Sequence, residues 1–332
     1  MEISEFARDP ETFLQLTERD VARLSDQLPD GYTQGVTHTV AMAGARASGK
    51  SLYIGVVVKL LEQLANRFDQ PFAPTSATRT VYREHYERPL FEAMSLMGAT
   101  PSSRSEDAYQ NQPLIFRLGR WTTPRGEHDH FLVIRDVAGE DLESRTPVPQ
   151  LNFMGSADLI IFLFDPLQVH QVKSNLKGLI PEQLELGGDP AVVLENLFGI
   201  LQGRRPRLAV TVSKFDTVQQ LGRLKDGQWK QVMGNPGSSL ARDTGWDYRE
   251  SDQRLVHLET QSLLTMMDAR QLVNRLQAGY PDSRAIRYFA VSSLGQAPVG
   301  EELAREGIAP YRCLDPVRWL LWDNGLFRGT GS

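Results

Sequence analysis

The sequence predicts an α/β fold, a three-layer sandwich in which a mainly parallel sheet has helices on both faces. Two observations support this prediction. Short apolar runs typical of buried strands alternate with longer stretches whose apolar residues recur at helical spacing. The pattern Gly-x-x-x-x-Gly-Lys-Ser, at residues 44–51, lies between the first apolar run and the first helical stretch. Strand, glycine-rich loop and helix is the context in which this pattern binds phosphate.

The alternation gives the expected elements in chain order. Strands are predicted at residues 36–43, 113–121, 130–135, 157–164, 208–212 and 285–291. Helices are predicted at residues 52–68, 81–97, 168–179, 191–201, 255–276 and 316–323. A turn at Pro124-Arg125-Gly126 joins the second and third strands into a hairpin.

We expect three parts along the chain. Residues 1–35 form an N-terminal helical extension, residues 36–325 the main domain, and residues 326–332 a tail. Within the main domain, a polar and glycine-rich stretch followed by a helical pattern predicts a helical insert at about residues 217–282.

The composition excludes several classes of protein. Hydrophobic residues make up 41% and charged residues 23% of the 332 residues, as in ordinary globular proteins. The net charge of −5 gives no indication of nucleic-acid binding, which usually requires a basic face. The longest apolar run, residues 159–164, is too short to span a bilayer. The single cysteine, Cys313, cannot form an internal disulfide, and the N-terminus lacks a signal-peptide core, so we expect a cytoplasmic protein.

The segment Gly44-Ala45-Arg46-Ala47-Ser48-Gly49-Lys50-Ser51-Leu52 has the residue types that a phosphate-binding loop, or Walker A motif, needs. Its two glycines allow backbone angles closed to other residues, so that consecutive N–H groups and the following helix N-terminus can hold phosphate oxygens. Lys50 is placed to reach the β- and γ-phosphates, and the Ser51 hydroxyl to bind Mg²⁺. The loop therefore predicts the P-loop NTPase fold.

Three strand ends carry further motifs in a fixed order. They are Asp136-Val137-Ala138-Gly139, Ser213-Lys214-Phe215-Asp216 and Ser292-Ser293-Leu294. In this order the sequence resembles the P-loop GTPases of the translation-factor and Ras-like (TRAFAC) class, over roughly residues 36–295. The resemblance implies that GTP or GDP and Mg²⁺ bind.

The resemblance also implies roles for the residues around the phosphates. Asp136 would hold Mg²⁺ through water, and the N–H of Gly139 would sense the γ-phosphate. A threonine of the first switch loop should complete the metal site. Thr100 is the best placed, because its loop directly precedes a predicted strand; it competes with Thr75, Thr78 and Thr80, and a plain turn residue is the alternative for Thr100.

At the other end of the nucleotide, Asp216 would accept two hydrogen bonds from guanine that adenine cannot donate. The stem of Lys214 would lie along the base. Ser213 stands where the family usually has Asn or Thr, which predicts a weaker tether and a reduced nucleotide affinity. The backbone of residues 292–294 would contact the guanine oxygen.

Two residues depart from the Ras-like pattern where hydrolysis is concerned. Glu140 occupies the position of a glutamine that orients water, and is either a water-orienting carboxylate or a solvated loop residue. Arg46 stands in the middle of the phosphate loop, where small residues are frequent, and either reaches across the phosphates or points to solvent.

The sequence therefore predicts a GTPase that hydrolyses GTP slowly and uses hydrolysis as a conformational switch. A nucleotide-binding scaffold with little turnover and an ATP-using P-loop NTPase are the alternatives. The sequence also resembles bacterial double-GTPase-type domains of conflict and signalling systems. The resemblance lies in the long region before Asp136, the insert and the C-terminal segment at residues 315–321. Such a protein is expected to have a protein effector and to pair with a second copy or with a partner GTPase.

Overall fold

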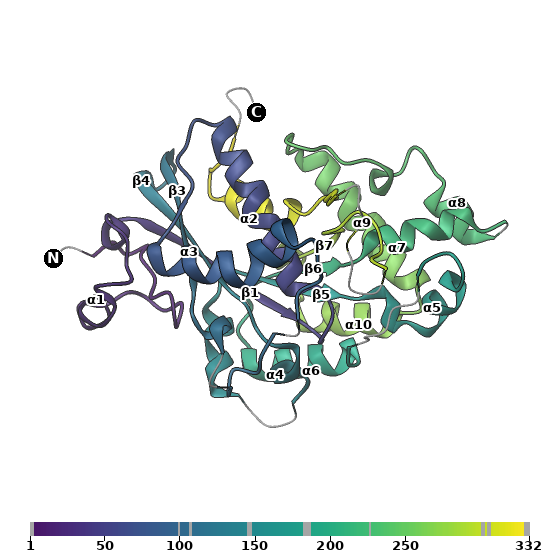
Figure 1. Ribbon diagram of the computed structural model, residues 1–332, viewed down its shortest axis with the longest axis horizontal. Helices are drawn as coiled ribbons and strands as arrows, with labels where there is room; N and C mark the ends of the chain where they lie inside the picture. Colours follow the sequence, from purple (N-terminus) through teal and green to yellow (C-terminus); the bar gives the residue numbers. More distant parts are fainter. Residues whose placement is uncertain are drawn as a thin grey trace.

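The computed structural model describes residues 3–98, 100–105, 108–144, 148–181, 187–225, 227–299, 303 and 307–328. Its centre is a seven-stranded sheet of order β2-β3-β4-β1-β5-β6-β7 (Figure 1). The strands are β1 (Val36–Gly44), β2 (Ala73–Pro74), β3 (Leu114–Thr123), β4 (Gly126–Arg135), β5 (Leu159–Phe164), β6 (Arg207–Val212) and β7 (Ile286–Ala290). The five strands from β4 to β7 in this order run parallel, whereas β2 and β3 are antiparallel to their neighbours. The prediction of a mainly parallel α/β sheet is confirmed.

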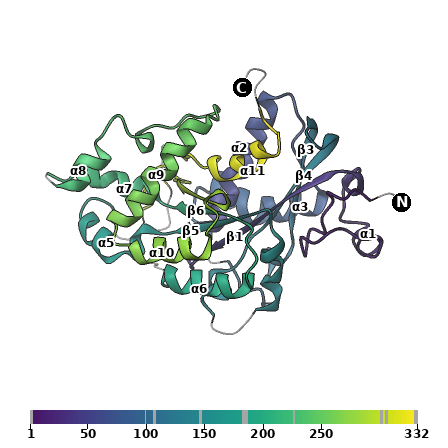
Figure 2. The ribbon, with the colours of Figure 1, turned by 180° about the vertical axis from the view of Figure 1, so that it is seen from behind.

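Helices cover both faces of the sheet. The α-helices are α1 (Glu18–Leu24), α2 (Lys50–Arg67), α3 (Ser76–Tyr82), α4 (Gly139–Glu143), α5 (His170–Leu176), α6 (Pro190–Leu201), α7 (Phe215–Gln219), α8 (Gln228–Met233), α9 (Glu250–Met266), α10 (Arg270–Gly279) and α11 (Asp315–Asp323). One apolar core lies between the sheet and α2 and α11, and the other lies between the sheet and α6, α9 and α10 (Figures 1 and 2). This arrangement is the predicted three-layer sandwich, and α7 to α10 lie between β6 and β7 as a helical insert.

The strand β1 is at the centre because its residues can be buried on both faces. All nine are buried, and most are small or apolar. The neighbouring β5, Leu-Ile-Ile-Phe-Leu-Phe, is also buried throughout, as expected for the middle of a parallel sheet. Since parallel strands end at the same edge, the residues that follow β1, β4, β6 and β7 gather at one edge, where ligands of open α/β sheets bind.

Two of the predicted helices differ in the structure. The stretch predicted as one helix over 81–97 holds the last two residues of α3 and a π-helix, η2 (Arg83–Glu92), in which Pro89 lacks the N–H of a regular helix, and residues 93–97 are not helical. The helix predicted at 255–276 is divided into α9 and α10 at Asp268, whose φ of 64° is left-handed. Both breaks depend on local backbone geometry that apolar periodicity does not report.

The ends of the chain pack against the central part. In the N-terminal region α1 has a capping box between Thr17 and Asp20. Leu326 and Phe327, in the predicted tail, are fully buried in the core on the α2 side. The predicted boundaries of the extension, main domain, insert and tail remain predictions. Among the described residues, no helix has both the length and the apolar character that crossing a membrane requires.

Candidate nucleotide-binding site

A cavity of about 480 Å³ at the carboxyl edge of the sheet contains both ends of the predicted site. The phosphate loop lines one part, and the segments after β6 and β7 line the other. The predicted site residues that line it are Arg46, Ala47, Ser48, Gly49, Lys50, Ser51, Leu52, Thr100, Gly139, Glu140, Ser213, Lys214, Asp216, Ser292, Ser293 and Leu294. The sequence motifs, although more than 200 residues apart at their extremes, therefore share one cavity.

The loop between β1 and α2 requires its two glycines. Gly44 has a φ of 147°, and a Cβ there would lie 2.7 Å from the Oγ of Ser48. Gly49 has a φ of 93° and directly precedes α2, so the first turn of the helix faces the cavity. The Oγ of Ser48 is buried and has no hydrogen-bond partner among the described residues. A buried unpaired hydroxyl beside N–H groups fits an anion such as phosphate.

Lys50 is the buried cation of this loop. Its Nζ donates to the carbonyl oxygens of Gly44 at 2.9 Å and Ala45 at 2.8 Å. Burial lowers the pKa of Lys50 to about 8, and the charges of Asp136 and Glu143 oppose that shift. The ammonium group thus lies inside the loop, where a phosphate oxygen would be within its reach.

Three oxygen-bearing side chains meet beside Lys50. Ser51 Oγ donates to Asp136 Oδ2 at 2.8 Å and lies 2.8 Å from Thr100 Oγ1. Burial raises the pKa of Asp136, against the effect of the Lys50 charge. Tyr86 of η2 also donates to Asp136 Oδ2, at 3.3 Å. The structure brings together the residues predicted to bind the metal.

Hydroxyl and carboxylate oxygens are the ligands that Mg²⁺ prefers, with phosphate oxygens and water completing the octahedron. The donor set of Ser51, Asp136 and Thr100 therefore fits magnesium. Thr75 and Thr78, two competitors of Thr100, instead bond to each other at the start of α3. No cluster of three or more His, Cys, Asp or Glu that could hold a metal occurs in the described part of the chain. Tyr86 escaped the sequence analysis because its helical spacing indicated only a packing role.

The start of α4 packs directly on the phosphate loop. A Cβ on Gly139 would lie 2.2 Å from the backbone N of Arg46, so only glycine permits this approach. The Arg46 guanidinium forms an ion pair with Glu140 at 3.2 Å, and both side chains are about half exposed. Glu143, which sequence analysis missed, accepts from the backbone N of Arg46 at 2.7 Å and of Gly188 at 3.2 Å.

The base end is formed by the residues after β6 and β7. Asp216 Oδ1 accepts from Ser292 Oγ at 2.6 Å, and burial raises the pKa of Asp216. Lys214, with a left-handed φ of 49°, donates from Nζ to Asp165 Oδ2 at 2.7 Å. Ser213 Oγ donates to the carbonyl of Phe164 at 3.2 Å. Asp165 was not predicted as a site residue, although its place directly after an apolar strand was the available signal.

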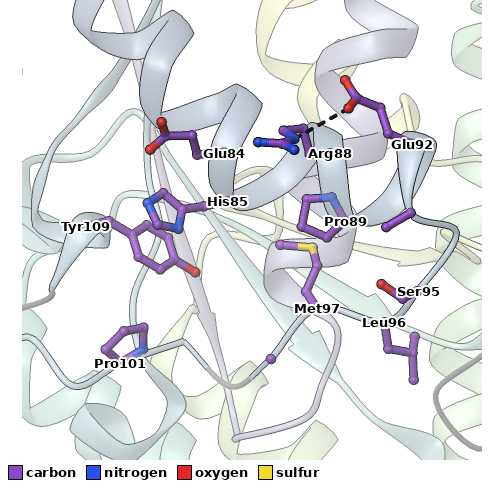
Figure 3. A pocket seen from close by; sticks show the side chains of 12 residues that line it. Glu84, His85, Arg88, Pro89, Glu92, Ser95, Leu96, Met97, Pro101 and Tyr109 are labelled. Carbon is purple, nitrogen blue, oxygen red and sulfur yellow. Dashed lines mark ion pairs between the residues drawn. The ribbon is translucent and has the colours of Figure 1, made fainter.

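A second cavity, of about 900 Å³, is lined by residues of η2 and by Pro101 and Tyr109 (Figure 3). The rings of His85 and Tyr109 stack there, with centroids 3.9 Å apart and planes 4° apart. Arg88 forms an ion pair with Glu92 at 3.4 Å on the same wall. Residues 96–98 line both cavities, but no part of the phosphate loop lines the second one. The smaller cavity is therefore the candidate nucleotide site.

The fold and the phosphate loop together define a P-loop nucleotide-binding protein. The family model Double-GTPase 2 matches residues 38–269. The chain belongs to the Double-GTPase 2 family and is a GTP-binding protein. The resemblance to P-loop GTPases, and to double-GTPase-type domains in particular, is confirmed.

A curated bacterial relative covers most of the chain. It is 41% identical over 298 residues, which are 88% of this chain and 76% of the relative. It is described as "Putative ESX-1 scaffolding and assembly protein SaeC" and comes from Mycolicibacterium smegmatis.

Solved structures of other GTPases are more distant. The bacterial selenocysteine-specific elongation factor EF-Sec aligns with a TM-score of 0.30 at 13% identity, over 86% of this chain and 29% of that chain. The Ski7 GTPase-like domain of S. cerevisiae, bound to GTP, aligns with a TM-score of 0.35 at 10% identity, over 95% of this chain and 54% of that chain. The chain thus spans less than two thirds of either protein, and scores this low add nothing to the family assignment.

Proposed function

We propose that this protein hydrolyses GTP with Mg²⁺ and uses hydrolysis as a conformational switch. One observation carries the proposal: a single cavity has a buried lysine and an oxygen-donor cluster at one end and a buried carboxylate, Asp216, at the other. A triphosphate requires the first end, and a guanine base fits the second.

At the phosphate end, the residues of the chain bind and neutralise charge. The amides of the loop and the Lys50 ammonium stabilise the negative charge that develops on the phosphates during hydrolysis. Ser51, Asp136 and Thr100 would hold Mg²⁺, which, when bound, neutralises charge on the β- and γ-phosphates. The short contacts among these three side chains support this assignment.

Hydrolysis needs a water molecule placed beside the γ-phosphate. Glu140 is the group we assign to orient that water, because it follows Gly139 and lines the cavity. The Arg46 ion pair fixes the Glu140 carboxylate and offsets its repulsion from the γ-phosphate. The water oxygen bonds to the γ-phosphorus, the bond to the β–γ bridging oxygen breaks with its electron pair staying on GDP, and a proton of the water passes to the phosphate oxygens before GDP and inorganic phosphate leave.

At the base end, Asp216 accepts the guanine N1–H and exocyclic amine, and its hydrogen bond from Ser292 sets the direction of the carboxylate. Asp165 holds the ammonium of Lys214, so that the lysine stem can cover one face of the base. The Ser213 hydroxyl is occupied by the carbonyl of Phe164, which supports the expected weaker tether.

The switch would consist of the Thr100 loop and α4. Both contact the phosphate end directly, through Ser51 in one case and through the backbone of Arg46 in the other. Loss of the γ-phosphate removes a ligand that both segments share, so both would relax after hydrolysis.

A scaffold with little turnover is the second candidate. The relative's description as a scaffolding and assembly protein supports it, as does Glu140, which stands where the Ras-like pattern has a water-orienting glutamine. In either case we propose protein partners, among them a second copy of the chain or a partner GTPase, and a place in the bacterial cytoplasm.

A single-turnover assay with γ-labelled GTP and excess protein separates the two candidates. A switch GTPase should release phosphate when Mg²⁺ is present and not when EDTA is added. Glu140→Ala should slow release by about 10²-fold or more without changing GDP affinity. The exposed hairpin variant Glu127→Ala is the matched control and should match wild type. Tight GTP binding without phosphate release over hours would favour the scaffold, and absence of GTP binding would refute both.

A further inference from the structure

The segment of residues 311–315, the C-terminal bridge, lies where three parts of the molecule meet. Ser292 of the base end exchanges two backbone hydrogen bonds with Tyr311, at 3.0 and 2.8 Å. Tyr53 of α2, the helix that follows the phosphate loop, donates to the carbonyl of Cys313 at 2.9 Å. Figures 1 and 2 show this yellow part of the chain close to both α2 and α9.

One buried arginine joins the bridge to the helical insert, beside the Tyr311 hydroxyl, which donates to the carbonyls of Leu240 and Arg242. The side chain of Arg312 is 0% exposed, and its backbone has a left-handed φ of 52°. Its Nη2 donates to Asp252 of α9 at 2.7 Å, and its Nη1 donates to Asp315 at 2.6 Å. The remaining contacts are with the carbonyls of Arg242 at 2.9 Å and Ser239 at 3.2 Å. The helical insert therefore holds the bridge through a buried cation that makes four hydrogen bonds.

From the bridge, an unbroken series of hydrogen bonds leads to the base end. Tyr311, next to Arg312, fixes the backbone of Ser292. The Oγ of Ser292 donates to Asp216 Oδ1 at 2.6 Å and accepts from the backbone N of Gly295 at 2.8 Å. The direction of the Asp216 carboxylate therefore depends on where the bridge holds Ser292.

We infer that Arg312 is a positioning residue for guanine recognition, through which the helical insert sets the orientation of Asp216. The inference rests on the proposed role of Asp216 in binding guanine. Removing the guanidinium leaves Asp315 as a buried charge without its cation and Asp252 with the half-exposed Arg242 alone, and such buried charges draw in water or move apart. Either response shifts Tyr311 and, with it, Ser292.

The coupling also works in the opposite direction. Because linked equilibria are reciprocal, guanine binding would stabilise the contact between the bridge and α9. A protein that binds the insert and disturbs Asp252 would weaken guanine binding to the same extent. The insert is thereby a place from which a partner protein can control nucleotide release without touching the phosphates.

The test compares the affinities of GDP and IDP, since inosine lacks the exocyclic amine that Asp216 accepts. Wild type should prefer GDP by about 10- to 100-fold, the value of one charge-assisted hydrogen bond. Arg312→Lys keeps the charge but loses the planar guanidinium that binds both aspartates, and should lower the preference for GDP about tenfold. A variant that is merely less stable has a smaller folded fraction. This lowers the apparent affinities for GDP and IDP by the same factor and leaves their ratio unchanged.

Two further variants complete the test. Arg254, on α9 like Asp252, pairs with Glu250 at 3.6 Å and its side chain is 76% exposed, so Arg254→Gln is the matched control and should keep the wild-type ratio. Asp252→Asn removes the partner on the insert and decides the question if Arg312→Lys does not fold. An unchanged GDP-to-IDP ratio in both Arg312→Lys and Asp252→Asn would overturn the inference. A wild-type protein without preference for GDP would instead refute the proposed guanine site itself.

Discussion

The two ends of the nucleotide cavity are constructed in different ways. At the phosphate end, the loop that would hold the phosphates is one continuous turn, residues 44–51, between β1 and α2, and Asp136 and Thr100 join it through Ser51. The base end is assembled from residues 213–216, residues 292–294 and the C-terminal bridge at residues 311–315. Backbone N–H groups suffice for phosphate, so glycine and a helix start can supply that end locally. Selecting a base needs a side chain held in one direction, and only tertiary contacts provide that.

The largest effect is expected at the phosphate end, from Lys50→Ala. The variant should bind neither GTP nor GDP measurably by calorimetric titration. The reason is that the Lys50 ammonium is the positive charge buried inside the loop, where the phosphates would bind. Lys59→Ala, on the same helix but paired with Glu87 at the surface, is the control and should bind as wild type does. GTP affinity that survives in Lys50→Ala would mean that the nucleotide binds elsewhere.

A smaller and more selective effect is expected at the base end, from Asp216→Asn. The amide can accept only one of the two guanine hydrogen bonds, so GTP affinity should fall by about 10- to 100-fold while ATP affinity stays the same. Competition between GTP and ATP measures the change in preference. Asp247→Asn, an exposed aspartate of the insert, is the control. If the affinities for GTP and ATP fall together, Asp216 supports the fold of the cavity and does not select the base.

The same contrast decides how much the sequence could predict. The loop at residues 44–51 and Asp136 were predictable, because each lies in a short motif whose spacing reflects local geometry. Thr100 was one of four candidates, since the loop that carries it has no periodic pattern. Its contact with Ser51 needed the fold.

At the base end, Asp216 and Ser292 were predictable from their places after strands. Asp165 and Arg312 were not predictable as site residues, because each acts through another residue that is distant in sequence. The parallel sheet was predictable for a related reason: strands buried on both faces are continuously apolar. The break at Asp268 depends on one backbone angle and leaves no mark on that pattern.

The smallest effect on nucleotide recognition is expected from a substitution in the sheet that supports both ends of the cavity. His38 on β1 and His130 on β4 are buried with their ring nitrogens 2.9 Å apart. Burial, together with the charges of His128 and Arg125, lowers the pKa of His130 to about 4, and burial likewise lowers that of His38. In the unfolded chain histidine titrates near 6.5, so the unfolded state takes up protons first as pH falls.

The pair therefore contributes stability that is complete above pH 6.5 and is lost as pH falls toward 4, by about 3 kcal/mol from His130 alone. Urea unfolding at pH 7, 5.5 and 4.5 should show this loss in wild type and in the exposed variant His170→Gln, and a shallower loss in His130→Gln. Because β1 and β4 lead to the phosphate end, which GTP and ATP would share, His130→Gln should leave the ratio of GTP to ATP affinity at pH 7 unchanged. A changed ratio would show that base selection depends on the centre of the sheet as well as on the C-terminal bridge.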